Sequence, residues 1–382
     1  MLSPAPRAGW LLDWLGQRRL VRAVISDGSD ALIGAELLDG IVSSLITLGS
    51  SDTDDGLNTG STHVRIPLQI PGEKDFDAVG FGLNAVDHLI VVPEYPAFDT
   101  KTRFTEYERS AGGQTASAMV ALQRLGLKTA YAGRFGSDDD GRFGLLSLEY
   151  EGVNLDFAET IEGADNQVAF IIIDSRSGER TIIWDRDERL SYRPDEVPID
   201  LATRGRVLHL DAHDPPACVV MARAAREVGA IVTADIDNVY EGLPELLPLI
   251  DVLITSSEFP HRLTGISDEP ASIIELKARY GCAIVGATLG AHGALIYVEG
   301  EFIESPAFEV PGGCRDTTGA GDAFHAGFIY GMLGGENLEE CMKLGNAVAA
   351  LKCRSLGGRA ALPTEGELRE FLKLSCPGLA QK

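Results

Sequence analysis

The residues best suited to catalysis lie in a loop of small side chains that ends in an acid, residues 316–322 (Asp-Thr-Thr-Gly-Ala-Gly-Asp). An apolar run over residues 323–333 follows, long enough for about three helical turns. The first amides of a helix lack intrahelical acceptors and lie at the positive end of the helix dipole. The small residues Gly319, Ala320 and Gly321 let an anion approach those amides closely. The loop is therefore predicted to bind an anion such as a phosphate group.

Asp322 places a carboxylate beside this predicted anion site. A negative charge next to a phosphate is unfavourable unless it has a task or a cation nearby. Two roles suit it: a general base toward a hydroxyl that attacks phosphorus, or an N-terminal cap of the following helix. In the second case the glycines only form a tight turn. The loop alone leaves both interpretations open.

Alternating strands and helices are expected to position this loop. The expected strands are 207–210, 231–236, 252–255 and 283–287, and the expected helices are 217–228, 245–250 and 271–280. Such alternation predicts a mainly parallel sheet that is covered by helices on both faces. Ligands of these sheets bind outside the carboxyl ends of the strands.

A second glycine-rich turn occupies residues 78–85. A dinucleotide-binding fingerprint would require a helix directly after such a turn. Residues 86–92 are instead rich in β-branched side chains and end at Pro93, which is typical of a strand. Dinucleotide binding is therefore not expected. The turn presents Asn84 and Asp87, a polar pair suited to sugar hydroxyls.

Two motifs resemble a known family. Residues 316–322 with Phe324 match D-T-T-G-A-G-D-x-F, the C-terminal signature of the PfkB/ribokinase family of carbohydrate kinases. Residues 112–117 are similar to the family's N-terminal signature G-G-x-x-x-N, with Ser117 where a sugar-binding asparagine is usual. A hydroxyl is shorter than an amide and offers fewer hydrogen bonds. The resemblance covers about residues 76–374.

The resemblance implies a ribokinase-like three-layer α/β/α sandwich, with a mainly parallel central sheet and a small β-sheet lid. The kinase domain is expected over residues 75–375, with lid strands near 99–110 and 165–186. In relatives such a lid closes over the sugar and often pairs two subunits, so a homodimer through the lid is expected. Residues 1–74, with a polar linker-like run, form a poorly ordered N-terminal extension in this interpretation, and 376–382 form a tail.

The resemblance also implies a division of roles. Asp322 would accept the proton of a sugar hydroxyl, while the amides of Gly319, Ala320 and Gly321 hold the developing charge on the γ-phosphate of ATP. The acceptor sugar would be bound by Asn84, Asp87, Gly112, Gly113 and Ser117. The nucleotide would be bound by Thr288, Gly290, Gly293, Thr318 and Asn346. The turn after Thr288 would also make sense as an ordinary hairpin turn.

Glu258 is the expected magnesium ligand. Residues 255–258 resemble the family's N-x-x-E element, with Thr255 in place of the asparagine. Mg²⁺ keeps several waters and takes few protein carboxylates, so one glutamate suffices. As an exposed glutamate at a helix start it would be unremarkable. The implied cofactor is Mg²⁺, the implied co-substrate is ATP, and relatives also use K⁺ near the Asp316 loop.

His209, Asp211 and His213 alternate along a strand end, so their side chains would point the same way, as a metal site requires. No second ligand cluster is evident in the sequence. Lining of the sugar pocket and a plain structural role are the alternatives to metal binding.

Composition narrows the function further. The 382 residues carry a net charge of -24, which disfavours nucleic acid and anionic membranes as partners. The six cysteines show no framework spacing, so reduced thiols in a cytoplasmic protein are expected. The predicted enzyme is a sugar kinase for a substrate of the ribose, fructose or 2-keto-3-deoxygluconate type. A nucleoside kinase of the same family and a non-catalytic sugar or nucleotide sensor are the alternatives.

Overall fold

The structure is a computed structural model that describes residues 64–176 and 178–375, together with the backbone of two short strands. These strands, β1 (Arg22–Val24) and β2 (Asp30–Leu32), pair antiparallel within a separate unit of residues 1–61. Most of the predicted N-terminal extension and the predicted tail after residue 375 lie outside the described residues. The candidate site lies in the larger unit, residues 62–382.

The larger unit is built on an eight-stranded sheet in the order β16-β15-β14-β13-β12-β11-β3-β6. In chain order these are β3 (Phe76–Phe81), β6 (Thr129–Ala132), β11 (Gly205–Leu210), β12 (Ile231–Ala234), β13 (Val252–Ser256), β14 (Ile284–Thr288), β15 (Ala294–Val298) and β16 (Glu301–Ser305). The strands from β14 to β6 are parallel, and β15 and β16 extend the sheet antiparallel. The mainly parallel sheet predicted from the sequence is confirmed.

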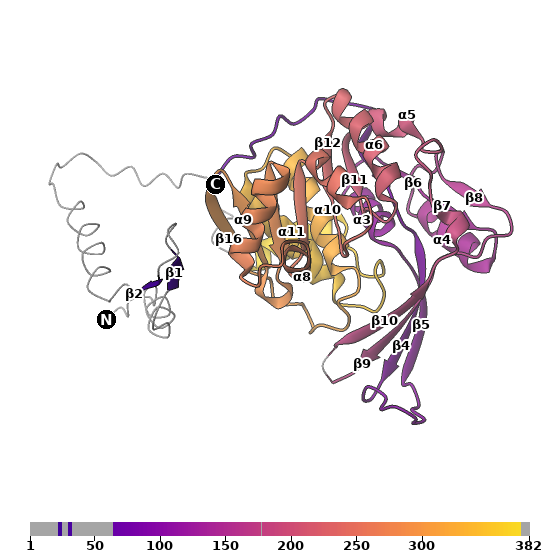
Figure 1. Cartoon of the computed structure of the whole chain (residues 1–382). Coiled ribbons are helices and arrows are strands. Elements are labelled where there is room, and N and C mark those ends of the chain that lie inside the picture. The colour runs from indigo at the N-terminus through magenta and orange to yellow at the C-terminus, as the bar shows by residue number, and fades with distance from the viewer. Residues whose placement is uncertain (1–21, 25–29, 33–63, 177, 376–382) are drawn as a thin grey trace. The chain divides into compact units, whose positions relative to one another are not determined.

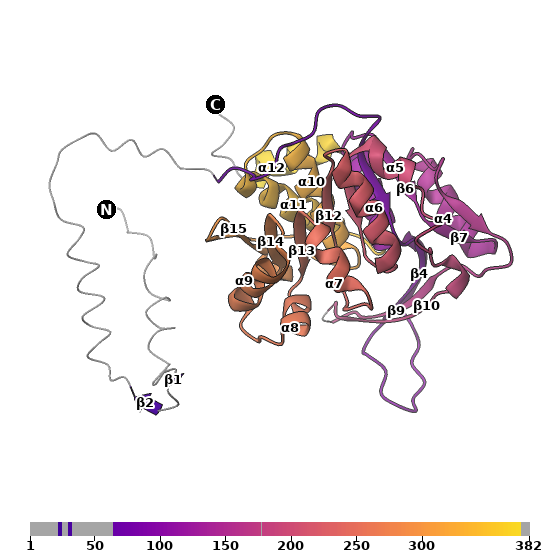
Figure 2. The same ribbon diagram turned by 45° about the horizontal axis from the view of Figure 1, so that its top comes forward.

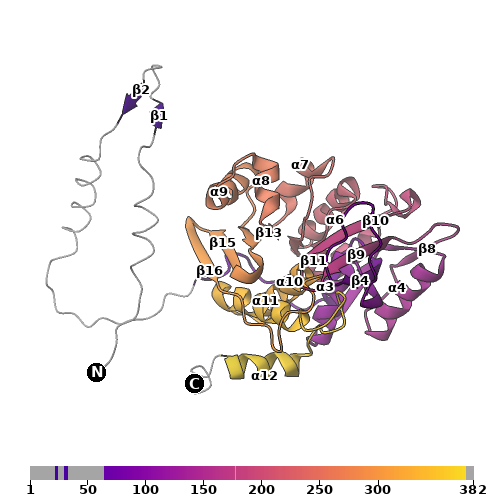
Figure 3. The same ribbon diagram turned by 90° about the horizontal axis from the view of Figure 1, so that it is seen from below.

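Helices cover both faces of this sheet, as Figures 1 and 2 show from two directions. Seen from below, helices α6 to α9 lie on one side of the strands and α10 to α12 on the other (Figure 3). The first group comprises α6 (Pro215–Glu227), α7 (Leu243–Leu246), α8 (Glu258–Thr264) and α9 (Glu269–Tyr280), with α5 (Ile199–Arg204) on the same core. The second comprises α10 (Ala320–Leu333), α11 (Leu338–Lys352) and α12 (Glu365–Ser375), with α3 (Gln114–Arg124) on the same core.

Each strand serves both cores because successive side chains point to opposite faces. In β3, Ala78 belongs to the core beneath α10 and α11, whereas Val79 belongs to the core beneath α6. Val207 and Leu208 divide in the same way in β11. A sheet buried on both faces therefore needs continuous apolar strands, and this is why its strands were recognisable in the sequence.

A second, four-stranded sheet, which we call the lid sheet, extends away from the layered body (Figure 1). Its order is β10-β9-β4-β5, with bounds β4 (Ala85–Val92), β5 (Glu106–Gly112), β9 (Val168–Asp174) and β10 (Arg180–Asp185). Leu89 and Ile171 form a small core of their own with Leu356. The strand predicted after the glycine-rich turn is β4, and this excludes a dinucleotide-binding turn there. Beside the sheet lie α4 (Asp139–Tyr150), β7 (Arg134–Gly136) and β8 (Glu159–Ile161).

The compact unit begins earlier than the predicted boundary at residue 75. Val64, Ile66, Leu68 and Ile70 are partly buried against the core beneath α10 and α11. The Val64 backbone donates to Glu339 Oε1 at 3.1 Å and accepts from the Leu338 amide at 3.1 Å. These residues lie in no strand or helix and precede β3, so no periodic pattern in the sequence joined them to the predicted kinase domain. Among the described helices, none has the length and apolar character needed to span a membrane.

Candidate active site

The loop before α10 is held by buried charges. Asp316 is almost fully buried and accepts hydrogen bonds from the amides of Thr318 and Gly357, each at 2.8 Å. The Lys352 ammonium, fully buried at the end of α11, donates to the Asp316 carbonyl at 2.9 Å. Gly319 then adopts a left-handed conformation with φ 75°, from which α10 begins. The first acid of the loop therefore builds the turn, and the last acid is left free of that task.

Two of the three amides predicted to face an anion remain available. The Ala320 amide donates to the Thr317 carbonyl at 3.1 Å, so it is occupied within the turn. Within the described residues, the amides of Gly319 and Gly321 have no recorded backbone acceptor. The predicted anion cradle is therefore narrower than the sequence indicated. Its donors are the amides of Gly319 and Gly321 at the positive end of α10.

Asp322 lies in the first turn of α10, whose N-cap residue is Gly319, so within the described part of the chain no side chain caps this helix. Burial raises its pKa well above the ordinary value of an aspartate, and the neighbouring carboxylates of Asp235 and Asp87 raise it further. A Cβ atom added to Gly321 would lie 3.6 Å from Asp235 Oδ2, so Asp235 flanks the same turn. The fold thus brings Asp322 into the electrostatic field of Asp87, which comes from a different sheet.

The residues predicted to bind the acceptor sugar gather at the base of the lid sheet. A Cβ atom on Gly112 would collide with the Asp87 carboxylate, and one on Gly113 (φ 91°) would lie 2.5 Å from Asn84 Cα. Asn84 Nδ2 donates to the Arg134 carbonyl at 2.7 Å, while its Oδ1 is buried without a partner in the described part of the chain. Burial raises the pKa of Asp87 to about 6, opposed chiefly by the positive charge of Arg359.

Ser117 has an unexpected partner. Its Oγ accepts a hydrogen bond from Arg359 Nε at 3.2 Å, in a buried contact between the first turns of α3 and the loop after α11. The serine at the position of the family's asparagine is thus combined with a guanidinium from a distant segment.

A cleft of about 960 Å³ joins the anion loop to the lid sheet and to α8. Thr317, Glu258 and Arg180 all line it, although they come from three separate parts of the chain. The Arg180 guanidinium, on β10, donates to Thr317 Oγ1. Glu258 is exposed at the start of α8 and pairs with Arg262 at 2.5 Å. A carboxylate that faces an open cleft suits a magnesium ion that keeps most of its waters.

A family model described as pfkB family carbohydrate kinase matches residues 77–365. The chain belongs to the PfkB family of carbohydrate kinases. It is similar to an uncharacterised sugar kinase of Archaeoglobus fulgidus, 31% identical over 254 residues that cover 64% of this chain and 98% of the relative. A nucleoside kinase of Methanothermobacter thermautotrophicus is 26% identical over 299 residues, covering 77% and 94%. The solved structure of Arabidopsis thaliana ribokinase with ribose and ATP has the same fold, with a TM-score of 0.68 at 23% identity, covering 78% and 99%.

Membership of this family makes the chain a phosphotransferase that uses an alcohol group as acceptor. The predicted family and fold are confirmed. The comparisons do not assign individual residues, so the roles of the predicted site residues remain predictions.

Of the residues predicted to bind the nucleotide, Asn346 and Gly293 serve to hold one segment. Asn346 Nδ2 donates to the Ser305 carbonyl and to Ser305 Oγ, both at 3.0 Å, and a Cβ atom on Gly293 would collide with the same carbonyl. They shape the end of β16 in this PfkB kinase. Gly290 begins the short turn after β14.

Thr288 and Thr318 have different surroundings. The Thr288 hydroxyl makes a long contact of 3.4 Å to the Thr255 carbonyl between neighbouring strands. Thr318 Oγ1 is buried and has no partner within the described residues. Because a buried hydroxyl is rarely left without a partner, Thr318 fits a position that a ligand completes.

The histidines considered as candidate metal ligands contact other side chains of the protein. His209 is fully buried, its Nδ1 lies 2.9 Å from Thr233 Oγ1, and burial lowers its pKa to about 3. Asp211 accepts from the Leu83 amide at 2.6 Å and from Thr115 Oγ1 at 2.9 Å, and so joins the glycine-rich turn to the start of α3. In the described part of the chain, no three His, Cys, Asp or Glu side chains are arranged to hold a metal. Metal binding at this cluster is therefore not supported.

Sequence reasoning missed several residues of the site. These are Asp235, His325, Lys352 and Arg359. His325 Nε2 lies 3.4 Å from Asp235 Oδ1, so the acid beside the anion loop has a partner of its own. A basic residue inside an otherwise apolar helix, as at Lys352, was a usable signal, because lysine is almost never fully buried unless it is paired.

Proposed function

We propose that this kinase transfers the γ-phosphoryl group of Mg-ATP to a hydroxyl of a small sugar, with Asp322 as general base. The observation that carries the proposal is the position of Asp322. It follows the free amides of Gly319 and Gly321 at the start of α10, and it lies within the electrostatic reach of Asp87 in the predicted sugar pocket. A base, an anion cradle and an acceptor site are the three parts that phosphoryl transfer requires.

The raised pKa of Asp322 is useful for this role. A general base works best when its pKa approaches the working pH, because it then binds the transferred proton more strongly. The sugar hydroxyl would give its proton to the Asp322 carboxylate as the oxygen forms its bond to phosphorus. Since the transition state of phosphoryl transfer is loose, positioning and charge stabilisation by the Gly319 and Gly321 amides should carry most of the rate.

Glu258 would hold Mg²⁺ through water at the edge of the cleft, and the ion would neutralise charge on the phosphates. Arg180, which reaches from the lid sheet to Thr317, is placed to add a positive charge on the same side.

Burial lowers the pKa of Lys352, and Asp316 opposes that shift. Because this ammonium already contacts the Asp316 carbonyl, we expect activity to depend little on K⁺, as tested by replacing K⁺ with choline.

One panel of acceptors tests the proposal. Release of ADP would be measured with ribose, fructose, 2-keto-3-deoxygluconate and adenosine, using the full chain. Turnover of any sugar supports the proposal. Turnover of adenosine alone would favour a nucleoside kinase, a candidate supported by the similarity to the Methanothermobacter thermautotrophicus nucleoside kinase. Thermal stabilisation by a sugar or by ATP without any ADP release would point to a non-catalytic sensor.

We also propose that the lid sheet pairs with a second copy of the chain. Ile183 on β10 is 57% exposed and is paired with Phe170 on β9, which is 45% exposed, so both side chains lie on the same face of the lid sheet. Such apolar exposure on one face of a small sheet is typical of an interaction surface. Light scattering after size exclusion should show a dimer, and Ile183→Glu should shift the mass to that of a monomer.

A further inference from the structure

Arg359 lies where the elements of the predicted sugar pocket meet. It belongs to the loop between α11 and α12 and is only 5% exposed. Its guanidinium donates to the Gly112 carbonyl at the end of β5, to Ser117 Oγ in α3 and to Ser147 Oγ in α4. The charge is therefore fixed against the same glycine that packs on the Asp87 carboxylate.

This guanidinium is buried without an ion pair. Within the described residues, no carboxylate lies within 4.0 Å of Arg359. Other arginines with little exposure are paired: Arg134 contacts Glu159 and Glu196, and Arg186 contacts Asp214. Burying a charge without a close partner is costly, so such a group normally has a partner that completes it.

The guanidinium keeps its charge and has donors to spare. Burial lowers the pKa of Arg359 to about 10, which leaves it protonated at neutral pH. A guanidinium offers five N–H donors in a planar arrangement. Arg359 makes three hydrogen bonds to described residues, and all three acceptors are neutral oxygens. The groups that best match such a fork are carboxylates and phosphates.

We infer that Arg359 determines substrate specificity by binding an anionic oxygen group on the acceptor sugar. The substrate would then be a sugar acid or a sugar phosphate, with its anionic group at Arg359 and its reacting hydroxyl at Asp322. The charges of Arg359 and Asp87 both act on Asp322, and Arg359 also acts on Asp87, so the three groups share one electrostatic environment. This inference deepens the proposed function and rests on it.

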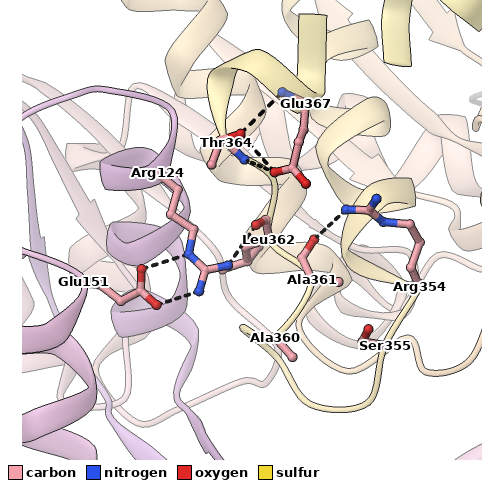
Figure 4. A pocket seen from close by; sticks show the side chains of 9 residues that line it. All are labelled: Arg124, Glu151, Arg354, Ser355, Ala360, Ala361, Leu362, Thr364 and Glu367. Atoms are coloured by element: carbon pink, nitrogen blue, oxygen red, sulfur yellow. Dashed lines mark hydrogen bonds and ion pairs between the residues drawn. The ribbon is translucent and has the colours of Figure 1, made fainter. Parts of the chain in front are cut away.

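The backbone of the loop that carries Arg359 is fixed by hydrogen bonds from Arg124. Arg124 pairs with Glu151 at 2.5 Å and donates to the carbonyls of Arg359 and Leu362 at 3.1 and 2.8 Å. Figure 4 shows this pair beside a cavity of about 520 Å³ on the outer side of the loop. A guanidinium whose backbone is fixed in this way is preorganised, so less conformational freedom is lost when an anion binds.

The wild-type protein gives the first test. ADP release would be compared for two charged acceptors, 2-keto-3-deoxygluconate and ribose 1-phosphate, and two neutral ones, ribose and fructose. We expect kcat/KM to favour at least one charged acceptor by on the order of 100-fold. Preference for the carboxylate or for the phosphate identifies which anion is used. Turnover of only the neutral sugars would overturn the inference while leaving the proposed kinase activity intact.

Variants give the second test. Arg359→Gln should reduce kcat/KM for the charged acceptor, mainly through KM, by on the order of 100-fold more than it reduces kcat/KM for neutral sugars. Arg359→Lys should reduce kcat/KM for the charged acceptor less than Arg359→Gln does, because lysine keeps the positive charge but lacks the planar set of guanidinium donors. Arg354→Gln is the matched control, since this arginine of the same loop bonds only to the carbonyls of Leu351 and Ala361.

Equal losses for charged and neutral sugars in a folded Arg359→Gln protein would show that the residue only shapes the pocket, and would overturn the inference. If no sugar releases ADP at all, the proposed function fails separately. Thermal stabilisation by the two charged sugars then decides about Arg359: it supports the inference if Arg359→Gln abolishes it, and contradicts it if the variant responds like wild type.

Discussion

At the residue scale, the candidate site is a balance of buried charges. The charges of Asp235 and Asp87 repel that of Asp322, and the pKa of Asp322 is raised partly for that reason. Lys352 and Arg359 oppose this repulsion, and among the described residues neither forms an ion pair with Asp322, Asp87 or Asp235, since Lys352 pairs with Asp316. A carboxylate with a raised pKa beside an anion site is suited to accept a proton. The destabilisation caused by these buried charges therefore falls at the place where the proposed reaction occurs.

Asp322→Asn removes the proposed base and keeps the shape of the side chain. We expect kcat to fall by about 100-fold to 10,000-fold, since an amide cannot accept the proton, while stabilisation by ATP stays near that of wild type. The measurement is a coupled ADP assay together with thermal shifts. In wild type, kcat should decrease as the pH falls below the raised pKa of Asp322, because the protonated acid is inactive as a base.

Asp139→Asn is the matched control for this variant. Asp139 also lies in the first turn of a helix, α4, and among the described residues its carboxylate forms only an exposed pair with Arg142. Its replacement should leave kcat unchanged. Turnover of Asp322→Asn at the rate of this control would refute the assignment of the base.

Asp87→Asn should make the protein more stable and less active. The pKa of Asp87 is about 6 in the fold against 3.8 for the free side chain. Between these values the native state binds more protons than the unfolded state, so the free energy of unfolding falls as the pH rises through that window. Removing the buried charge should therefore raise the free energy of unfolding by on the order of 2 kcal/mol at about pH 8.

The same comparison at about pH 4, where the acid is protonated in the native state, should show almost no difference. Denaturant titrations at the two pH values measure both results, and the ADP assay should show a raised KM for the sugar. A variant that is destabilised at the higher pH would mean that Asp87 holds the fold together rather than binding substrate.

Sequence patterns gave Asp322 and Asp87 but missed Asp235 and the cations Lys352 and Arg359. Asp322, Asp87 and the glycines around them are close along the chain to turns and helix starts, so their motifs are local. The cations come from distant parts of the sequence. Arg359 contacts Gly112, which lies 247 residues earlier, and Lys352 contacts Asp316, which lies 36 residues earlier. The apolar setting of Lys352 marks it as a buried cation, but no local pattern shows which acids it or Arg359 acts on, because these contacts form only once the helices have packed.

At the scale of elements, the site depends on how α10 begins. Gly319 turns the chain with φ 75°, and a Cβ atom there would lie 2.9 Å from Gly358 Cα. The close approach lets the Asp316 carboxylate reach the Gly357 amide on the facing loop. The free amides of the anion cradle therefore exist because two glycine-containing loops pack backbone against backbone.

Gly319→Ala should impair catalysis more than its backbone strain alone explains. The added methyl would push the Gly358 loop away and displace the amides beside the predicted phosphate, so kcat should fall by on the order of 10-fold to 100-fold. Gly335→Ala is the control, because Gly335 also has a positive φ (81°) but open space around its Cβ position. Equal effects of both variants on kcat would show that close packing at Gly319 is not what positions the cradle.

At the scale of the whole molecule, the repetitive part of the fold was predictable and its boundary was not. The parallel strands β11 to β14 are continuous apolar runs, and each predicted strand overlaps the observed one. The lid strands β5, β9 and β10 also overlap the predicted lid ranges near 99–110 and 165–186, although β10 is exposed along its entire length. The first packed segment, from Val64 on, has no strand or helix of its own and takes its order from the core it covers.

Two truncations test where the folded kinase begins. A chain that starts at Thr62 keeps Val64, Ile66, Leu68 and Ile70, whereas one that starts at Asp75 lacks all four. Because these side chains are partly buried against the core, their loss should lower the free energy of unfolding by roughly 2–4 kcal/mol. The shorter chain should also lose the hydrogen bonds between Val64 and the start of α11, the helix that ends in Lys352 and so supports the anion loop. Denaturant titration and the ADP assay would be carried out on both chains. Equal free energies of unfolding for the chains that start at Asp75 and at Thr62 would contradict this prediction.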